Sequence, residues 1–168
     1  QIVVSTGAKQ SIANLVLSLV NPGDEVIILS PYWVSYQALV QLAEADVKYV
    51  HADISNDFKV TPSELEANIS NRTRLLIFSS PCNPTGSSYS KKELEALAVV
   101  IAKYPNVLVV SDEIYEYINF TDEKHFSIGS IPSLKDQVVT VNGVSKGFAM
   151  TGWRIGYMGG PLWLAKAC

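Results

Sequence analysis

The sequence has little cysteine and no cluster of positive charge. Only two of its 168 residues are cysteines, Cys82 and Cys168. Two are too few for a disulfide framework or a four-ligand zinc site, so we expect a reducing compartment and place the protein in the cytoplasm. The formal net charge is -3, and Lys and Arg form no block. Because nucleic acids are bound by clustered basic faces, no nucleic-acid partner is expected.

Long apolar runs are absent as well. No stretch approaches the ~20 residues of a transmembrane helix, and no signal peptide is visible, so no membrane partner is expected. His51 and His125 are isolated and lack the spacing of a metal site, so no metal is predicted. The hydrophobic content of 48% with 17% charged residues is typical of a folded domain with a substantial core.

Both ends of the chain lie inside predicted elements. It opens without methionine in the strand-like run at 1–4, and it stops at Cys168 in a helical pattern begun by Pro161. No repeat, low-complexity tract or linker interrupts it. We therefore expect residues 1–168 to form one domain, truncated at both ends relative to a longer protein.

Short apolar runs alternate with helical patterns along the chain. Strands are predicted at 2–5, 26–29, 47–50, 75–78, 107–110, 138–141 and 155–158. Helices are predicted after Gly7, over about 33–45, from capping boxes at Thr61/Glu64 and Ser90/Glu93, the latter to about Lys103, and from Pro161. This alternation implies an α/β fold of three layers, α/β/α, around a mostly parallel sheet of about seven strands. The connection before the last strand is too short for a long helix, which favours an antiparallel last strand.

Polar segments follow four of the predicted strands. They are Gly7-Ala8-Lys9, the run SPCNPTG at 80–86, the run SDEIY at 111–115 and Ser145-Lys146. Parallel strands would bring these segments to one edge of the sheet, where ligands bind in open α/β folds. A functional site is therefore predicted there.

Each polar residue also has a structural explanation. Gly7-Ala8-Lys9 at a helix start suits a phosphate, but taken alone it is better explained as an ordinary strand-to-helix turn. Arg154 could clamp a phosphate or simply face water. Asp112 at the end of an apolar strand needs a partner to be buried, or it caps a helix that starts at Glu113.

The remaining candidates are equally ambiguous when taken alone. Asn83 lies between two prolines that fix the direction of its amide, although turn formation explains part of this pattern. Tyr32 and Trp33 are either core residues or a platform for a planar ligand. Lys146, on the turn after a buried strand, is by itself better explained as a solvated loop charge than as a catalytic residue.

Together the motifs are specific. SPCNPTG, SDEIY and SKGFAMTGWRIGY (145–157) occur in an order and spacing that resemble the large domain of fold-type I pyridoxal-phosphate enzymes. The resemblance covers essentially the whole chain and is strongest to class I aminotransferases such as the prokaryotic aspartate aminotransferases. It implies pyridoxal 5′-phosphate as cofactor, amino acids and 2-oxo acids as substrates, and a homodimer as the full-length protein.

The resemblance also implies a role for each matching residue. Lys146 would form a Schiff base with the cofactor and act as general base and acid. Asp112 would keep the pyridine nitrogen protonated. Asn83 and Tyr115 would hydrogen-bond the phenolic oxygen and Trp33 would stack on the ring, while Ala8, Lys9, Ser145 and Arg154 would hold the phosphate. Trp33, Asn83 and Lys9 would also face the substrate, with Lys9 favouring an acidic side chain such as that of aspartate.

Two departures from the family pattern and several alternatives remain. Cys82 stands where asparagine or another small polar residue is usual. Gly143 stands where many relatives have a phosphate-binding serine, and Ser145 is the candidate to replace it. The same framework serves pyridoxal-phosphate C–S lyases, aminocyclopropane-carboxylate synthases and non-catalytic regulatory domains. A dinucleotide-binding Rossmann domain is disfavoured because no GxGxxG follows the first strand. The residues that would bind the substrate α-carboxylate lie outside this sequence.

Overall fold

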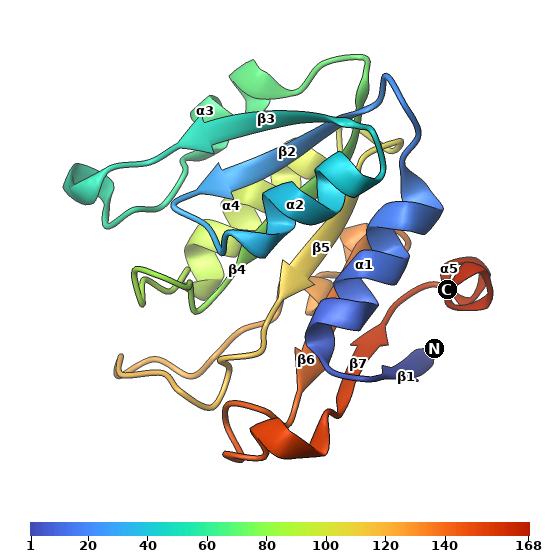
Figure 1. Ribbon diagram of the computed structural model, residues 1–168. Helices are drawn as coiled ribbons and strands as arrows, with labels where there is room; N and C mark the ends of the chain where they lie inside the picture. Colours follow the sequence, from blue (N-terminus) through green and yellow to red (C-terminus); the bar gives the residue numbers. More distant parts are fainter.

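The valine-, isoleucine- and leucine-rich runs predicted as strands all form strands in the computed structural model, which describes residues 1–168. They are β1 (Ile2–Ser5), β2 (Glu25–Ser30), β3 (Asp46–His51), β4 (Thr73–Ser79), β5 (Leu108–Asp112), β6 (Val138–Gly143) and β7 (Gly156–Gly159). All seven belong to one sheet, in the order β1-β7-β6-β5-β4-β2-β3 (Figure 1). The predicted α/β class and number of strands are confirmed.

The strand directions follow from the connections. The pairs β2–β3, β2–β4, β4–β5 and β5–β6 are parallel, as crossover connections require. The β6–β7 connection holds only the short 3-10 turn η4 (Thr151–Trp153), and β7 runs antiparallel to both β6 and β1. The antiparallel last strand is therefore confirmed.

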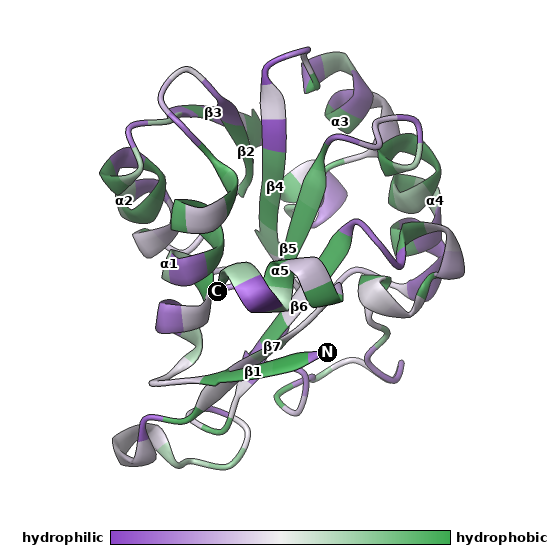
Figure 2. Ribbon diagram, turned by 90° about the vertical axis from the view of Figure 1, so that its right-hand side faces the viewer, coloured by the Kyte–Doolittle hydropathy of each residue, from purple (hydrophilic) through white to green (hydrophobic).

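Helices cover both faces of the sheet. They are α1 (Ala8–Leu19), α2 (Ser35–Leu42), α3 (Pro62–Asn68), α4 (Lys91–Ile101) and α5 (Leu162–Ala167), with 3-10 turns η1 (Ile54–Asn56), η2 (Ile128–Ser130) and η3 (Pro132–Leu134). Helices α1, α2 and α5 pack on one face, and α3 and α4 on the other, with the apolar strands between them (Figure 2). No helix has both the length and the apolar character to cross a membrane.

Side-chain alternation along the strands creates two cores. In β2, Val26 and Ile28 pack toward α1 and α2, whereas Ile27 and Leu29 pack toward α3 and α4. Each of these four residues is at most 5% exposed. A sheet covered in this way on both faces requires continuously apolar strands, which explains why the strand signal in the sequence was strong.

Local sequence signals fix some helix ends and not others. Thr61 with Glu64 and Ser90 with Glu93 form the predicted capping boxes of α3 and α4. The helix predicted over 33–45 is shorter than expected, because α2 begins only at Ser35 and a positive φ of 57° at Glu44 terminates the segment. Helix α4 likewise ends at Ile101, two residues before the predicted end.

Candidate functional site

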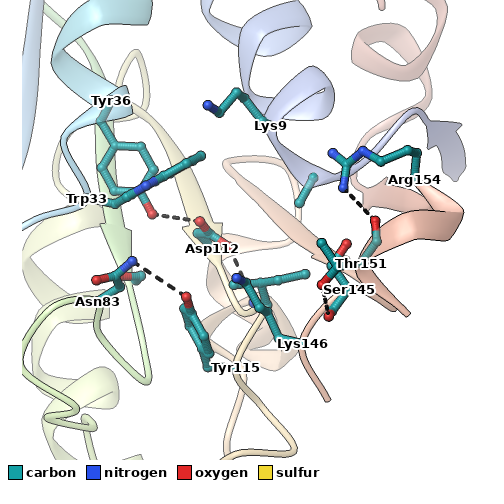
Figure 3. A pocket seen from close by; sticks show the side chains of 13 residues that line it. Lys9, Trp33, Tyr36, Asn83, Asp112, Tyr115, Ser145, Lys146, Thr151 and Arg154 are labelled. Carbon is teal, nitrogen blue, oxygen red and sulfur yellow. Dashed lines mark hydrogen bonds between the residues drawn. The ribbon is translucent and has the colours of Figure 1, made fainter. Parts of the chain in front are cut away.

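One pocket of about 190 Å³ lies where the carboxyl ends of β4, β5 and β6 meet the amino ends of α1 and α2 (Figure 3). Its lining consists of Ala8, Lys9, Trp33, Tyr36, Ser79, Asn83, Asp112, Ile114, Tyr115, Ser145, Lys146, Thr151 and Arg154. All nine residues that the sequence predicted for the site are among these. The fold thus brings together residues that are spread over most of the chain.

Asp112, the last residue of β5, forms the buried floor of the pocket. Only 4% of it is exposed. Its carboxylate accepts a hydrogen bond from the Tyr36 hydroxyl at 2.7 Å and one from the Ile114 amide at 3.3 Å. Burial raises the pKa of Asp112 to about 6, and the two hydrogen bonds oppose this rise. The carboxyl group is therefore mostly ionised at neutral pH.

Lys146, Tyr115 and Asn83 surround Asp112 on the adjoining loops. Lys146 follows β6 by three residues, and its Nζ lies 5.9 Å from the centroid of the Tyr115 ring. The Asn83 amide nitrogen donates to the Tyr115 hydroxyl at 3.5 Å. Asn83 is held by a tight turn in which the Gly86 amide donates to the Cys82 carbonyl at 2.8 Å. A primary amine, a phenol and an amide therefore converge above one carboxylate.

The amino end of α1 has no side-chain cap. Its N-cap is Gly7, with φ of 83°. The Arg154 guanidinium lies against Gly7, so closely that a Cβ at position 7 would collide with it. The Arg154 Nη1 atom also donates to the Thr151 carbonyl at 3.1 Å, which fixes the direction of the side chain. Free helix amides next to a guanidinium form a site suited to phosphate.

Trp33 forms one wall of the pocket and has contacts on two sides. Its ring meets the Tyr36 ring edge-on, with centroids 5.6 Å apart and planes at 87°. The Lys9 Nζ lies 4.8 Å from the Trp33 ring centroid, a cation–π geometry. Trp33 is half-buried, so its role as both core residue and pocket wall agrees with the two explanations that the sequence left open.

Ser145 lines the pocket, whereas Gly143 is packed so tightly that it has no space for a side chain. The Ser145 carbonyl accepts a hydrogen bond from the Thr151 hydroxyl at 2.8 Å, and the residue lines the pocket. A Cβ at Gly143 would lie only 2.8 Å from the Ile155 carbonyl oxygen. A serine at Gly143 is therefore incompatible with this packing, which explains the departure noted in the sequence.

The possibility that Asp112 caps a following helix is wrong. Residues after Asp112 form turns, and the next regular element is η2. The Ile114 amide that donates to Asp112 belongs to such a turn. Asp112 therefore stabilises a turn with one oxygen and bonds Tyr36 with the other.

His125, for which the sequence indicated no role, lies beside the buried Glu113. Its Nε2 is 2.9 Å from Glu113 Oε2, while the Ser111 and Ser127 hydroxyls donate to Oε1 at 2.9 and 2.7 Å. Glu116 is the third member of this group. These hydrogen bonds satisfy the buried Glu113 carboxylate. They also connect the segment after β5 to Ser111 in the sheet.

The sequence prediction missed four of the pocket residues, namely Tyr36, Ser79, Ile114 and Thr151. Tyr36 lies three positions after Trp33, so the helix predicted over 33–45 could have placed both on one face. Ser79 is the last residue of β4, and its buried hydroxyl has no hydrogen-bond partner. No local signal marks it, because its position depends on the pairing of β4 with β5.

The comparison with known families agrees with this geometry. The model of the family described as aminotransferase class I and II matches residues 1–167. The chain belongs to this family. The resemblance inferred from the three motifs is thus confirmed. The matched region includes every residue that lines the pocket.

Individual relatives are similar over the whole chain. A bifunctional aspartate aminotransferase and glutamate/aspartate-prephenate aminotransferase of Petunia hybrida is 51% identical over 168 residues, which are 100% of this chain and 35% of that protein. An aspartate/prephenate aminotransferase of Nitrosomonas europaea is 49% identical over 162 residues, 96% of this chain and 41% of that protein.

Solved structures give the same result. The aspartate aminotransferase of Rhizobium meliloti superposes with a TM-score of 0.96 at 44% identity, over 99% of this chain and 42% of that one. The Thermus thermophilus aspartate aminotransferase with maleate has a TM-score of 0.93 at 44% identity, over 99% and 42%. The chain thus spans 35% to 42% of the length of these family members.

Proposed function

We propose that this chain forms the pyridoxal-phosphate site of an aminotransferase, with Lys146 as the residue that binds the cofactor covalently. The observation that carries the proposal is the single pocket that joins Lys146, Asp112 and the open amino end of α1. Family membership over residues 1–167 supports it. We also propose that residues 1–168 are one cofactor-binding domain and that the complete enzyme is a homodimer, as the resemblance implies.

The residues present fit the cofactor at both of its ends. The Gly7 turn has no side chain, so the Ala8 and Lys9 amides and the Arg154 guanidinium can all reach a phosphate. At the opposite end, Asp112 offers a buried carboxylate to a protonated ring nitrogen, and Ser79 has a buried hydroxyl that lacks a partner. A phosphate site and a carboxylate at opposite ends of one pocket suit a phosphorylated pyridine.

When bound, pyridoxal phosphate supplies an electron sink that stabilises negative charge at the substrate Cα. Asp112 would hold the ring nitrogen, since its ionised carboxylate accepts a hydrogen bond in a dry environment. Tyr115 and Asn83, already joined by a hydrogen bond, would fix the ring hydroxyl, and the half-buried Trp33 would orient the ring by stacking.

Lys146 would move the proton of the reaction. Lys146 is exposed at the mouth of the pocket, with its amine over the Tyr115 ring (Figure 3). A primary amine in this place can take a proton from the Cα atom of an amino acid and deliver it to a different carbon atom. That transfer is the step shared by all transaminations.

For the substrate we propose aspartate or a similar amino acid, with a 2-oxo acid as acceptor. Relatives whose names include aspartate aminotransferase are about half identical to this chain. Lys9 places a cation over Trp33 at the pocket edge, where it could meet an acidic side chain. Ammonia and pyruvate released from a cysteine-like substrate without an oxo-acid acceptor would instead indicate a lyase.

The test is the visible absorbance of the chain after incubation with pyridoxal phosphate and removal of the excess. We expect a bound-cofactor band in the wild type and its loss in Lys146→Ala. Lys135→Ala, an exposed lysine outside the pocket, is the matched control and should keep the band. A Lys146→Ala protein with an unchanged band would refute the proposal.

A further inference from the structure

Asp112 is held by a side chain that the proposed function leaves without a role. Tyr36, on α2, donates from its hydroxyl to Asp112 Oδ2 at 2.7 Å, across 76 positions of sequence. Tyr36 is only 1% exposed and Asp112 only 4%. Figure 3 shows this hydrogen bond at the floor of the pocket, behind Trp33. A hydrogen bond to a charged group, away from water, is among the stronger polar contacts in proteins.

No other side chain hydrogen-bonds Asp112. The remaining donor is the Ile114 amide, which is longer at 3.3 Å and reaches the other oxygen. Ser79 is the register partner of Asp112 in the β4–β5 pair, yet its buried hydroxyl makes no hydrogen bond. Removing the Tyr36 hydroxyl would therefore leave the carboxylate with a single donor from the backbone.

The surroundings keep Tyr36 a donor and give Asp112 no other neutralising contact. Burial, together with the neighbouring Asp112 and Cys82, raises the pKa of Tyr36 well above its ordinary value, so the phenol keeps its proton. The other titratable or charged groups near Asp112 are Glu113 and Tyr115 on its own segment, Lys9 on α1, and Lys146 and Arg154 on the connection after β6. None of these forms a hydrogen bond with Asp112.

We propose that Tyr36 is a positioning residue that keeps the Asp112 carboxylate ionised and aimed into the pocket for a protonated ring nitrogen. The ligand in this inference rests on the proposed function. The hydrogen bond itself is a property of the chain without any ligand, so the two can be tested separately.

The first experiment is a carbon-13 NMR titration of the Asp112 carboxyl group in the chain without cofactor, with Asp112→Asn used to assign the signal. The wild type should titrate at about 6. Tyr36→Phe keeps the ring and its packing on Trp33 but loses the donor, so the pKa should rise by about one unit or more. A Tyr36→Phe chain in which Asp112 titrates as in the wild type would overturn the proposal.

Tyr89→Phe is the matched control for a merely structural effect. Tyr89 is also buried, and its hydroxyl accepts a hydrogen bond from the Val60 amide at 2.8 Å, away from the pocket. Both variants lose a buried phenol hydroxyl, but only Tyr36→Phe should shift the Asp112 titration. An equal shift in Tyr89→Phe would contradict a specific role of Tyr36.

The second experiment measures the dissociation constant for pyridoxal phosphate from pH 6 to 9. Tyr36→Phe should bind more weakly near pH 6, by about fivefold or more, and recover toward pH 9, because its Asp112 carboxyl group ionises only at a higher pH. Identical pH profiles in the two proteins would refute the positioning role. If the wild type bound no cofactor, the proposed function would fail, while the NMR titration would still decide whether Tyr36 controls Asp112.

Discussion

At the scale of single residues, two neighbouring serines at the end of β4 differ in one respect. The Ser80 hydroxyl accepts a hydrogen bond from the Tyr89 amide at 3.0 Å, whereas the Ser79 hydroxyl has no partner. Both residues are buried, at 2% and 7% exposure. Deleting the Ser80 hydroxyl therefore leaves the Tyr89 amide without its acceptor, whereas deleting the Ser79 hydroxyl breaks no hydrogen bond.

We expect Ser80→Ala to lower the free energy of unfolding by about 1–3 kcal/mol, the cost of a buried unsatisfied amide. Ser79→Ala should change it by less than about 0.5 kcal/mol or raise it slightly. Urea denaturation of both variants beside the wild type measures the difference. Equal losses would mean that Ser79 has a partner in solution, contrary to the structure.

The same residues show how far a sequence can predict a site. Lys146, Asp112 and Asn83 were recognisable because each lies in a motif whose residues are close in sequence. Tyr36 was not recognisable, because its importance depends on a hydrogen bond to Asp112, which lies 76 positions away in the sequence. Ser79 depends likewise on the β4–β5 register. Contacts of this kind arise only after the elements have packed.

At the scale of elements, the segment after β5 is irregular and yet anchored. The Glu113 amide donates to the Val141 carbonyl of β6 at 2.8 Å, and its carboxylate bonds His125 and Ser127 further along. The segment also carries Tyr115 into the pocket. Anchoring through Glu113 therefore supports the position of Tyr115 without a helix.

His125 should make this anchor dependent on pH. Its hydrogen bond with Glu113 is the main cause that raises the pKa of His125 above its ordinary value. A raised folded-state pKa means that the stabilisation is complete below about pH 6.5, the unfolded value, and is lost as the pH rises through the folded value. Glu113 and Glu116 are the acidic groups that face the imidazole.

We expect His125→Gln, which keeps a donor but does not titrate, to be less stable than the wild type by about 1 kcal/mol below pH 6.5. The difference should shrink above that pH. Urea denaturation between pH 5.5 and 9 measures it, and the titration of Asp112 cancels because both proteins contain it. A difference that stays constant with pH would rule out a charged His125.

Element boundaries were predicted where a local hydrogen bond sets them. The capping boxes of α3 and α4 were found because both partners lie within four residues. The start of α2 was placed two residues too early, because Trp33 forms a wall of the pocket and Val34 is the N-cap of the helix.

At the scale of the whole molecule, the sheet order brings the two ends of the chain to one site. Strand β1 pairs with β7 and not with β2, which places the Gly7 turn against Arg154. The α/β class could be predicted from the alternation of strand and helix patterns, and the antiparallel β7 from the short connection before it. The pairing of β1 with β7 could not be predicted, because no local pattern specifies which strand lies next to the edge strand β1.

The most direct test of the central claim is to identify the lysine that binds the cofactor. The chain would be incubated with pyridoxal phosphate, treated with borohydride to make the attachment permanent, digested and analysed by mass spectrometry. We predict that the modified peptide carries the label on Lys146. Modification of Lys9, the other lysine of the pocket, in place of Lys146 would contradict the account, as would an unmodified chain.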